Sequence, residues 1–196
     1  RELIERQVAY VHALRCMLRV QDILADEAVQ RALPEGERSG LRGERNIPYA
    51  LLHRQAERIT ELSARGALDA FRLQSIDRTI ATLLDVQGGC ERIKNTPMPR
   101  GYAFIGERLI WAYAVLFPFV IVGDLGWLSI PISVLVCLSF ALISEAGRVL
   151  EDPFTMFWNS LPLSALSTTI EINLRQRLGD AELPPAPQPM PPGVLM

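Results

Sequence analysis

Carboxylates and histidines are the side chains in this sequence that could carry acid–base catalysis or bind a metal, and their spacing defines no site. The two histidines, His12 and His53, lie far apart. Neither a glycine-rich phosphate loop nor a Gly-x-Ser-x-Gly elbow occurs. We interpret the carboxylates near the apolar part of the chain as solvated faces and ion pairs: Glu91, Glu107, Glu145, Glu151 and Asp152. The sequence therefore predicts no enzyme, no metal site and no cofactor.

Three cysteines are the remaining reactive groups. Cys16, Cys90 and Cys137 share no redox or metal-binding spacing, so we expect three reduced thiols with packing roles. The chain opens on the amphipathic start of a helix and not on a signal peptide. Because it also lacks an initiator Met, we expect further residues to precede it.

The distribution of apolar residues is more informative than the overall composition. A net charge of −2 gives no basic field for a nucleic-acid partner. From Leu109 to Ile143, however, 35 residues contain one charge, Asp124, whereas the first hundred residues are dense in Arg and Glu. This contrast indicates a membrane-embedded segment next to a water-exposed one.

The apolar segment divides into two stretches, Leu109–Gly123 and Gly126–Ile143, with a turn at Asp124-Leu125. As a helix, the second stretch is about 27 Å long, close to the thickness of a bilayer core. The first is only about 22 Å long unless it begins at Tyr102, which places Glu107 and Arg108 within it. Two prolines, Pro118 and Pro131, lie in mid-segment, as membrane helices allow.

Basic residues flank the hairpin at both ends, and its turn contains none. This is the positive-inside pattern of a hairpin with both ends in the cytosol. It argues against a buried hairpin of a soluble protein and favours a multi-pass protein of the inner (plasma) membrane. The flanking residues are Arg92, Lys94, Arg100, Arg108 and Arg148.

Helical periodicity dominates the first hundred residues. Apolar residues three and four apart predict one helix from Glu2 to Val29, followed by a loop from Pro34 to Arg45. A second helix is expected from Asn46 to about Gly66. A third begins near Asp69, is loosened at Gly88-Gly89 and ends before the two prolines that follow Asn95.

After the hairpin, an amphipathic stretch ends at Pro153, and a short helix is expected from about Ser164 to Leu178, with Gly179 as its stop. The last fourteen residues contain six prolines and no charge, so we expect disorder there. The predicted fold is all-α. Its parts are a cytosolic helical region (1–100), a transmembrane hairpin (101–148), a cytosolic return segment with a helix (149–180) and the proline-rich tail (181–196).

Several short strings, taken in order around this hairpin, resemble the bacterial bestrophin family of ion channels, from about Ile4 to Gly179. They are Gly89-Cys90-Glu91-Arg92-Ile93, Asn95-Thr96-Pro97-Met98-Pro99, Glu151-Asp152-Pro153-Phe154 and Thr169-Ile170-Glu171-Ile172-Asn173-Leu174, with Val8-Ala9-Tyr10 and His12 before them. The motif positions Glu91, Arg92, Asn95, Pro97 and Glu151 to Phe154 are interpreted as structural or interfacial.

The resemblance implies a homopentamer around a central pore, with four membrane helices per subunit. The third and fourth would lie in this chain, and the pore-neck helix would precede it. The implied function is passive, chloride-type anion conductance, with the lipid bilayer, other copies of the chain and permeant inorganic ions as partners. Two alternatives stay open: a monovalent cation (sodium) channel of the same fold, and a membrane-anchored helical scaffold.

The resemblance also implies two local expectations. Counting back without a gap from Gly89-Cys90 places the family's apolar ring at the cytosolic pore exit on Phe71; the alternative is that Phe71 packs in the core. The Glu151-to-Phe154 string corresponds to the calcium clasp of animal members, but Thr155-Met156-Phe157-Trp158 follows it here. Since Ca²⁺ takes about six to eight oxygen ligands, we expect no calcium activation, and a helix-end or intersubunit role for Asp152.

Overall fold

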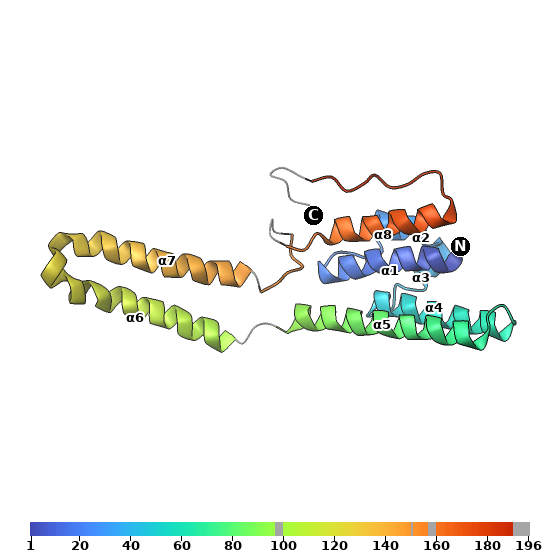
Figure 1. Ribbon diagram of the computed structural model, residues 1–196, viewed down its shortest axis with the longest axis horizontal. Coiled ribbons are helices and arrows are strands. Elements are labelled where there is room, and N and C mark those ends of the chain that lie inside the picture. The colour runs from blue at the N-terminus through green and yellow to red at the C-terminus, as the bar shows by residue number, and fades with distance from the viewer. Residues whose placement is uncertain (97–99, 150, 157–159, 190–196) are drawn as a thin grey trace. The chain divides into compact units, whose positions relative to one another are not determined.

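The computed structural model describes residues 1–96, 100–149, 151–156 and 160–189. The chain divides into two compact units (Figure 1). We call them the helical body, which comprises Arg1–Lys94 and the residues from Phe154 onward, and the hairpin unit, Asn95–Pro153. All regular elements in the described residues are helices, which confirms the predicted all-α fold.

The first helix is shorter than the sequence predicts. α1 spans Glu2–Leu18, and the expected single helix to Val29 is wrong, because the chain reverses between the two positions. Val20 adopts a left-handed φ of 57°. Asp26 then caps the N-terminus of α2 (Glu27–Ala32), its side chain accepting two backbone N–H groups. The apolar spacing continues through this reversal, so periodicity alone could not reveal it.

The next two helices show one correction and one confirmation. A short helix, α3 (Glu35–Ser39), lies inside the expected loop. α4 spans Ile47–Ala64 as predicted, since the side chain of Asn46 accepts a hydrogen bond from the backbone N–H of Tyr49 at 3.1 Å. Gly66, with a φ of 76°, follows the end of the helix.

α5 spans Ala70–Asn95 and begins where the sequence predicts. The carboxylate of Asp69 accepts the backbone N–H of Arg72 at 2.8 Å. The expected loosening at Gly88-Gly89 is not seen, and the helix continues through both residues. Each glycine costs a helix only about 1 kcal/mol, and side chains on both sides of the pair are anchored to α4, as described below.

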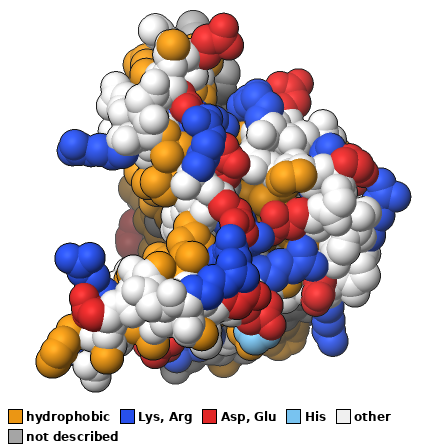
Figure 2. Space-filling model, turned by 90° about the vertical axis from the view of Figure 1, so that its right-hand side faces the viewer, with side chains coloured by type: hydrophobic (Ala, Val, Ile, Leu, Met, Phe, Trp, Pro, Cys, Tyr) orange, Lys and Arg blue, Asp and Glu red, His pale blue; other side chains and the backbone are white. Residues whose placement is uncertain are grey.

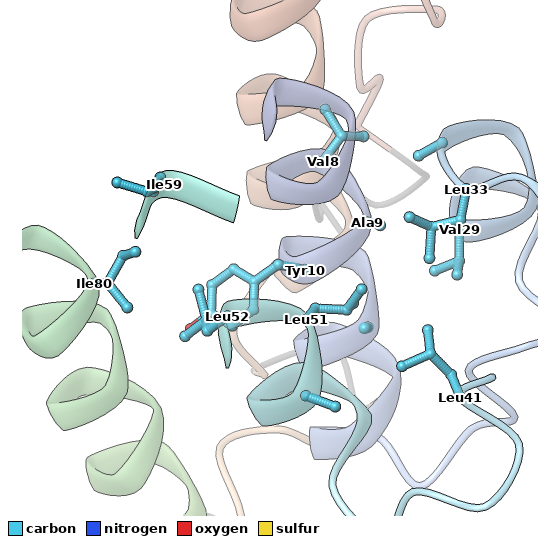
Figure 3. Close-up of a cluster of buried hydrophobic side chains, with 13 residues drawn as sticks. Val8, Ala9, Tyr10, Val29, Leu33, Leu41, Leu51, Leu52, Ile59 and Ile80 are labelled. Carbon is cyan, nitrogen blue, oxygen red and sulfur yellow. The ribbon is translucent and has the colours of Figure 1, made fainter. Parts of the chain in front are cut away.

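The core of the helical body lies between α1, α2, α4 and α5 (Figure 3). α1 is central, and it lies against α2, α4 and α8. Removing such a side chain from water stabilises the fold by about 1.5–3 kcal/mol. The members of this cluster that are 3% exposed or less are Val8, Ala9, Tyr10, Ala13, Val29, Ala32, Leu33, Leu41, Leu51 and Leu52.

α8 spans Leu163–Leu178, one residue longer than predicted, and packs along α1 (Figure 1). Gly179 ends it with a φ of 77°, the left-handed conformation that a glycine stop adopts. Residues 181–189 form no helix or strand. The rest of the proline-rich tail lies outside the described residues.

The hairpin unit consists of α6 (Arg100–Leu125), the 3-10 turn η1 (Gly126–Leu128) and α7 (Ser129–Val149). The expected turn at Asp124-Leu125 is placed too early, because both residues belong to α6 and the reversal occurs at Gly126, whose φ is 55°. α6 begins early enough to contain Glu107 and Arg108. The two arms lie side by side (Figure 1).

The two prolines of the hairpin occupy different positions. Pro118 lies inside α6, as expected. Pro131 is not in mid-segment but in the first turn of α7, where a helix loses nothing from a missing N–H.

Candidate functional site

The hairpin turns most of its apolar side chains outward. Only 11% of its most apolar stretch is buried within the chain. The helical segment Phe104–Arg148, which comprises most of α6, η1 and most of α7, is long and apolar enough to cross a membrane. With 26 and 21 residues, α6 and α7 would be about 39 and 31 Å long, and a bilayer core is about 30 Å thick. Each arm therefore has the length of one crossing.

Two serine hydroxyls of the hairpin have hydrogen-bond acceptors within it, and an aromatic pair joins its two arms. The hydroxyl of Ser133 donates to the carbonyl of Ser129 at 2.6 Å, and that of Ser139 to the carbonyl of Leu135 at 2.9 Å. Tyr113 meets the ring of Phe140 on the other arm edge-on, with centroids 6.2 Å apart. Such internal partners are what a segment without access to water requires.

Phe71, the predicted pore aperture, lies in the first turn of α5 and is 85% exposed. At about 100° per residue, it points away from Ile80, which is buried in the core cluster. The alternative that Phe71 packs in the core of the chain is therefore wrong. The aperture itself stays a prediction.

Glu91 fastens α5 to the start of α4. Its carboxylate accepts hydrogen bonds from the amides of Asn46 at 2.9 Å and Gln87 at 2.7 Å. Gln87 also donates to the side-chain oxygen of Asn46 at 3.1 Å, and it is almost fully buried. These contacts fix the rotation of α5 about its own axis. Glu91 therefore helps to decide which side of α5 faces outward.

The other motif residues near the end of α5 are not brought into this cluster. The side chains of Arg92 and Asn95 are exposed. Pro97 lies outside the described residues.

Solvent exposure decreases along the motif from Glu151 to Phe154, which follows the hairpin. Glu151 is exposed, Asp152 and Pro153 are half-buried, and Phe154 is buried at 3% exposure. Met156, two residues further on, is 55% exposed. Within the described ranges, no three His, Cys, Asp or Glu side chains are placed to hold a metal ion.

A buried ionic cluster that the sequence did not reveal joins the two ends of the helical body. Nε2 of His12 lies 2.8 Å from a carboxylate oxygen of Glu171, and both side chains are 2% exposed or less. Nε of Arg175 donates to the other oxygen at 2.7 Å. Arg175 also pairs with Asp180, which in turn accepts from Arg1. The sequence offered one sign of this cluster, a histidine on the apolar face of α1. It could not identify the partner, which lies 159 positions away.

The environment of Glu171 keeps it ionised. Burial by itself favours the neutral acid, but the hydrogen bonds and electrostatic interactions with His12 and Arg175 outweigh it and lower the pKa of Glu171. The cluster therefore attaches α8 to α1 as a charged clasp.

A hollow lies between α1, α3 and α4, and several of the charged side chains that line it pair with one another. Glu2 pairs with Arg6 at 2.8 Å and with Arg58 at 3.2 Å, and Arg6 also pairs with Glu37 at 2.5 Å. Figure 2 shows acidic and basic side chains interspersed over one face of the molecule, without a patch of a single sign. Arg54 instead donates to the backbone carbonyls of Glu37 and Gly40. The hollow is lined by Glu2, Arg6, Glu37, Arg54, Glu57, Arg58 and Glu61.

A helical body attached to an outward-facing apolar hairpin defines a helical membrane protein. Comparison with known proteins specifies which kind. Residues 1–176 match the sequence model of a family described as "Bacterial/Fungal Bestrophin protein". The chain thus belongs to the bacterial bestrophin family, as its motifs predict.

Its relatives include curated proteins and solved structures. It is 31% identical to the voltage-dependent anion channel-forming protein YneE of Salmonella typhi, covering 93% of this chain and 60% of that protein. It is 32% identical to the corresponding protein RSc3414 of Ralstonia nicotianae, covering 93% and 59%. A crystal structure of a bacterial bestrophin homolog from Klebsiella pneumoniae is similar with a TM-score of 0.83 and 32% identity, covering 92% of this chain and 66% of that one. The chain spans about 60% of the length of the curated relatives it matches.

Proposed function

We propose that this chain is part of a channel that conducts anions passively across a membrane. The observation that carries the proposal is the outward-facing apolar hairpin of a chain that matches the bestrophin family over residues 1–176. Relatives named as voltage-dependent anion channel-forming proteins support anions as the permeant species. Passive conductance requires no catalytic group, and its driving force is the ion gradient.

In this proposal the two units have separate tasks. The hairpin contacts lipid, and the helical body surrounds the cytosolic part of the ion passage in a homopentamer. Phe71 lies at the narrowest cytosolic point, where five exposed aromatic side chains make an apolar collar that controls wetting. The clasp between His12 and Glu171 keeps each subunit rigid around that passage.

The topology follows from the same pattern of charges. Both ends of the hairpin lie in the cytosol of a multi-pass inner-membrane protein, with η1 outside. Single cysteines at Leu125 and Asn95, in a background without the three natural cysteines, test this in intact cells. An impermeant thiol reagent added outside should label Leu125→Cys and leave Asn95→Cys unlabelled. The opposite labelling would overturn the topology.

The function is tested by recording the complete protein in planar bilayers with a salt gradient. Anion conductance predicts a reversal potential close to the chloride equilibrium potential. A reversal potential near that of sodium would show a cation channel of the same fold. Absence of current from correctly assembled protein would favour the membrane-anchored scaffold.

A further inference from the structure

α5 has two distinct faces along its 26 residues. One face packs on the core cluster through Ile80 and its neighbours at helical spacing, and Gln87 is buried on the same side. At about 100° per residue, seven positions lie within about 40° of the direction opposite Ile80. These positions, which we call the outer stripe, are Phe71, Ser75, Arg78, Thr82, Asp85, Gly89 and Ile93.

The outer stripe has the composition of a surface that faces water. Its large apolar residues, Phe71 and Ile93, lie near its two ends, and the residues between them are small or polar. The centre of a protein–protein interface is depleted in charged residues, whereas this stripe carries two in its middle. Val86, the remaining large exposed apolar side chain of α5 in the described residues, lies just outside the stripe on the side of Ile93, where a neighbouring copy would pack.

Arg78 is the cation of this stripe, and its charge is not compensated. The positions three and four residues away, where a helix places ion-pair partners, are Gln74, Ser75, Ala81 and Thr82. In the described part of the chain, Arg78 makes no ion pair, and only its backbone carbonyl takes part in a side-chain hydrogen bond, from Thr82. By contrast, Arg72 on the same helix pairs with Asp69 at 3.4 Å.

We infer that Arg78 is a selectivity-determining residue, which attracts inorganic anions to the cytosolic passage beside the Phe71 collar. The inference rests on the proposed function. Arg78 lies seven positions after Phe71, or about 10 Å along the helix. Five guanidinium groups would therefore form a positive ring about two helical turns from the apolar constriction. Such a ring raises the local concentration of the counter-ion. Asp85 is a further 10 Å or so away, beyond the screening length of about 8 Å at physiological salt.

The test is the Arg78→Gln variant of the complete protein, recorded in planar bilayers under a chloride gradient. We expect the ratio of anion to cation permeability to fall about tenfold, and Arg78→Glu to shift the reversal potential further toward that of the cation. Because Arg78 is exposed, the melting temperature should not change. Arg72→Gln removes a charge from the same helix away from the outer stripe, and it should keep the wild-type reversal potential.

The outcomes separate this inference from the proposed function. An anion-selective wild type with an unchanged reversal potential in Arg78→Gln would overturn the role of Arg78 and leave the channel standing. An equal shift in Arg72→Gln would also overturn it, since the effect would then follow net charge and not position. A wild type that selects cations or carries no current would overturn both.

Discussion

Leu51 of α4 and Leu116 of α6 are the same residue type in opposite environments. Leu51 is completely buried at 0% exposure, whereas Leu116 is 63% exposed. The helical body excludes water by packing its apolar side chains against each other, and its surface carries charged pairs. The hairpin instead presents most of its apolar side chains outward, and the hydroxyls of Ser133 and Ser139 are bonded to its own backbone. The two units are therefore built for different solvents.

The charges repeat this contrast. In the helical body, a buried carboxylate is acceptable because Glu171 has two donors in fixed positions. In the hairpin unit, the ion pair between Glu145 and Arg148 lies near the C-terminal end of α7. A substitution that suits the environment of one unit should therefore be harmful in the other. We expect each of the following substitutions to affect one unit and leave the other intact.

The largest effect is expected from Glu171→Ala. The substitution leaves the buried His12 without its partner and removes the acceptor of Nε of Arg175, which keeps Asp180, so the free energy of unfolding of the helical body should fall by about 3–5 kcal/mol. Denaturant unfolding of the purified protein measures it. Glu171→Gln, which keeps the shape and loses the charge, should cost less.

The clasp also gives a pH dependence. Since the pKa of Glu171 is lowered in the folded protein, its stabilisation is complete above the pKa of the unfolded chain and is lost as the pH falls through the folded pKa. Glu171→Gln should therefore lose less stability than the wild type on acidification. Equal acid sensitivity of the two proteins would contradict the clasp.

Matched leucine truncations test the contrast directly. Leu51→Ala should lower the free energy of unfolding by about 2–5 kcal/mol, because it removes buried contacts and leaves a cavity. Leu116→Ala, at an exposed position, should leave the unfolding of the helical body unchanged. The pair is measured by thermal unfolding in detergent micelles. Similar losses in both variants would show that the hairpin face is packed against protein and not lipid.

An arginine introduced on the hairpin should impair membrane insertion, an effect of intermediate size. Leu116→Arg places a charge on the outward face near the middle of α6, which costs about 2.5–3.5 kcal/mol on membrane insertion. The fraction of protein that resists carbonate extraction should fall. Leu183→Arg, in the segment beyond α8, is the control and should insert like the wild type.

A smaller effect concerns Tyr10 at alkaline pH. Burial, with contributions from nearby Cys90 and Glu91, raises the pKa of Tyr10 to about 12. A raised folded pKa means that stability is complete below the unfolded value near 10 and declines until the pH passes about 12, at up to roughly 1.4 kcal/mol per pH unit. Tyr10→Phe should remove this decline, as alkaline unfolding curves would show.

The smallest effect on stability is expected from Phe71→Ala. Because Phe71 is 85% exposed, the free energy of unfolding should change by no more than about 0.5 kcal/mol. If five copies form the collar, conductance or open probability should nevertheless rise, because a wider ring wets more easily. Both quantities are measured on one preparation of the complete protein. Unchanged single-channel properties would remove Phe71 from the pore.

The sequence by itself determined the features that depend on local patterns. The 35 residues with one charge predicted the hairpin, and Asn46, Asp69 and Gly179 predicted helix ends, because capping needs only neighbouring residues. Ordered motifs predicted the family.

Only the tertiary structure decided features that depend on residues far apart in the chain. The reversal after α1 breaks no periodicity, so the packing of α2 against α1 had to reveal it. The pairing of His12 with Glu171 spans 159 residues, and nothing local to either residue specifies the other. Which side of α5 faces outward depends on its anchoring to Asn46 on α4. Burial is a property of all packed elements together, and this is why a short window of sequence cannot supply it.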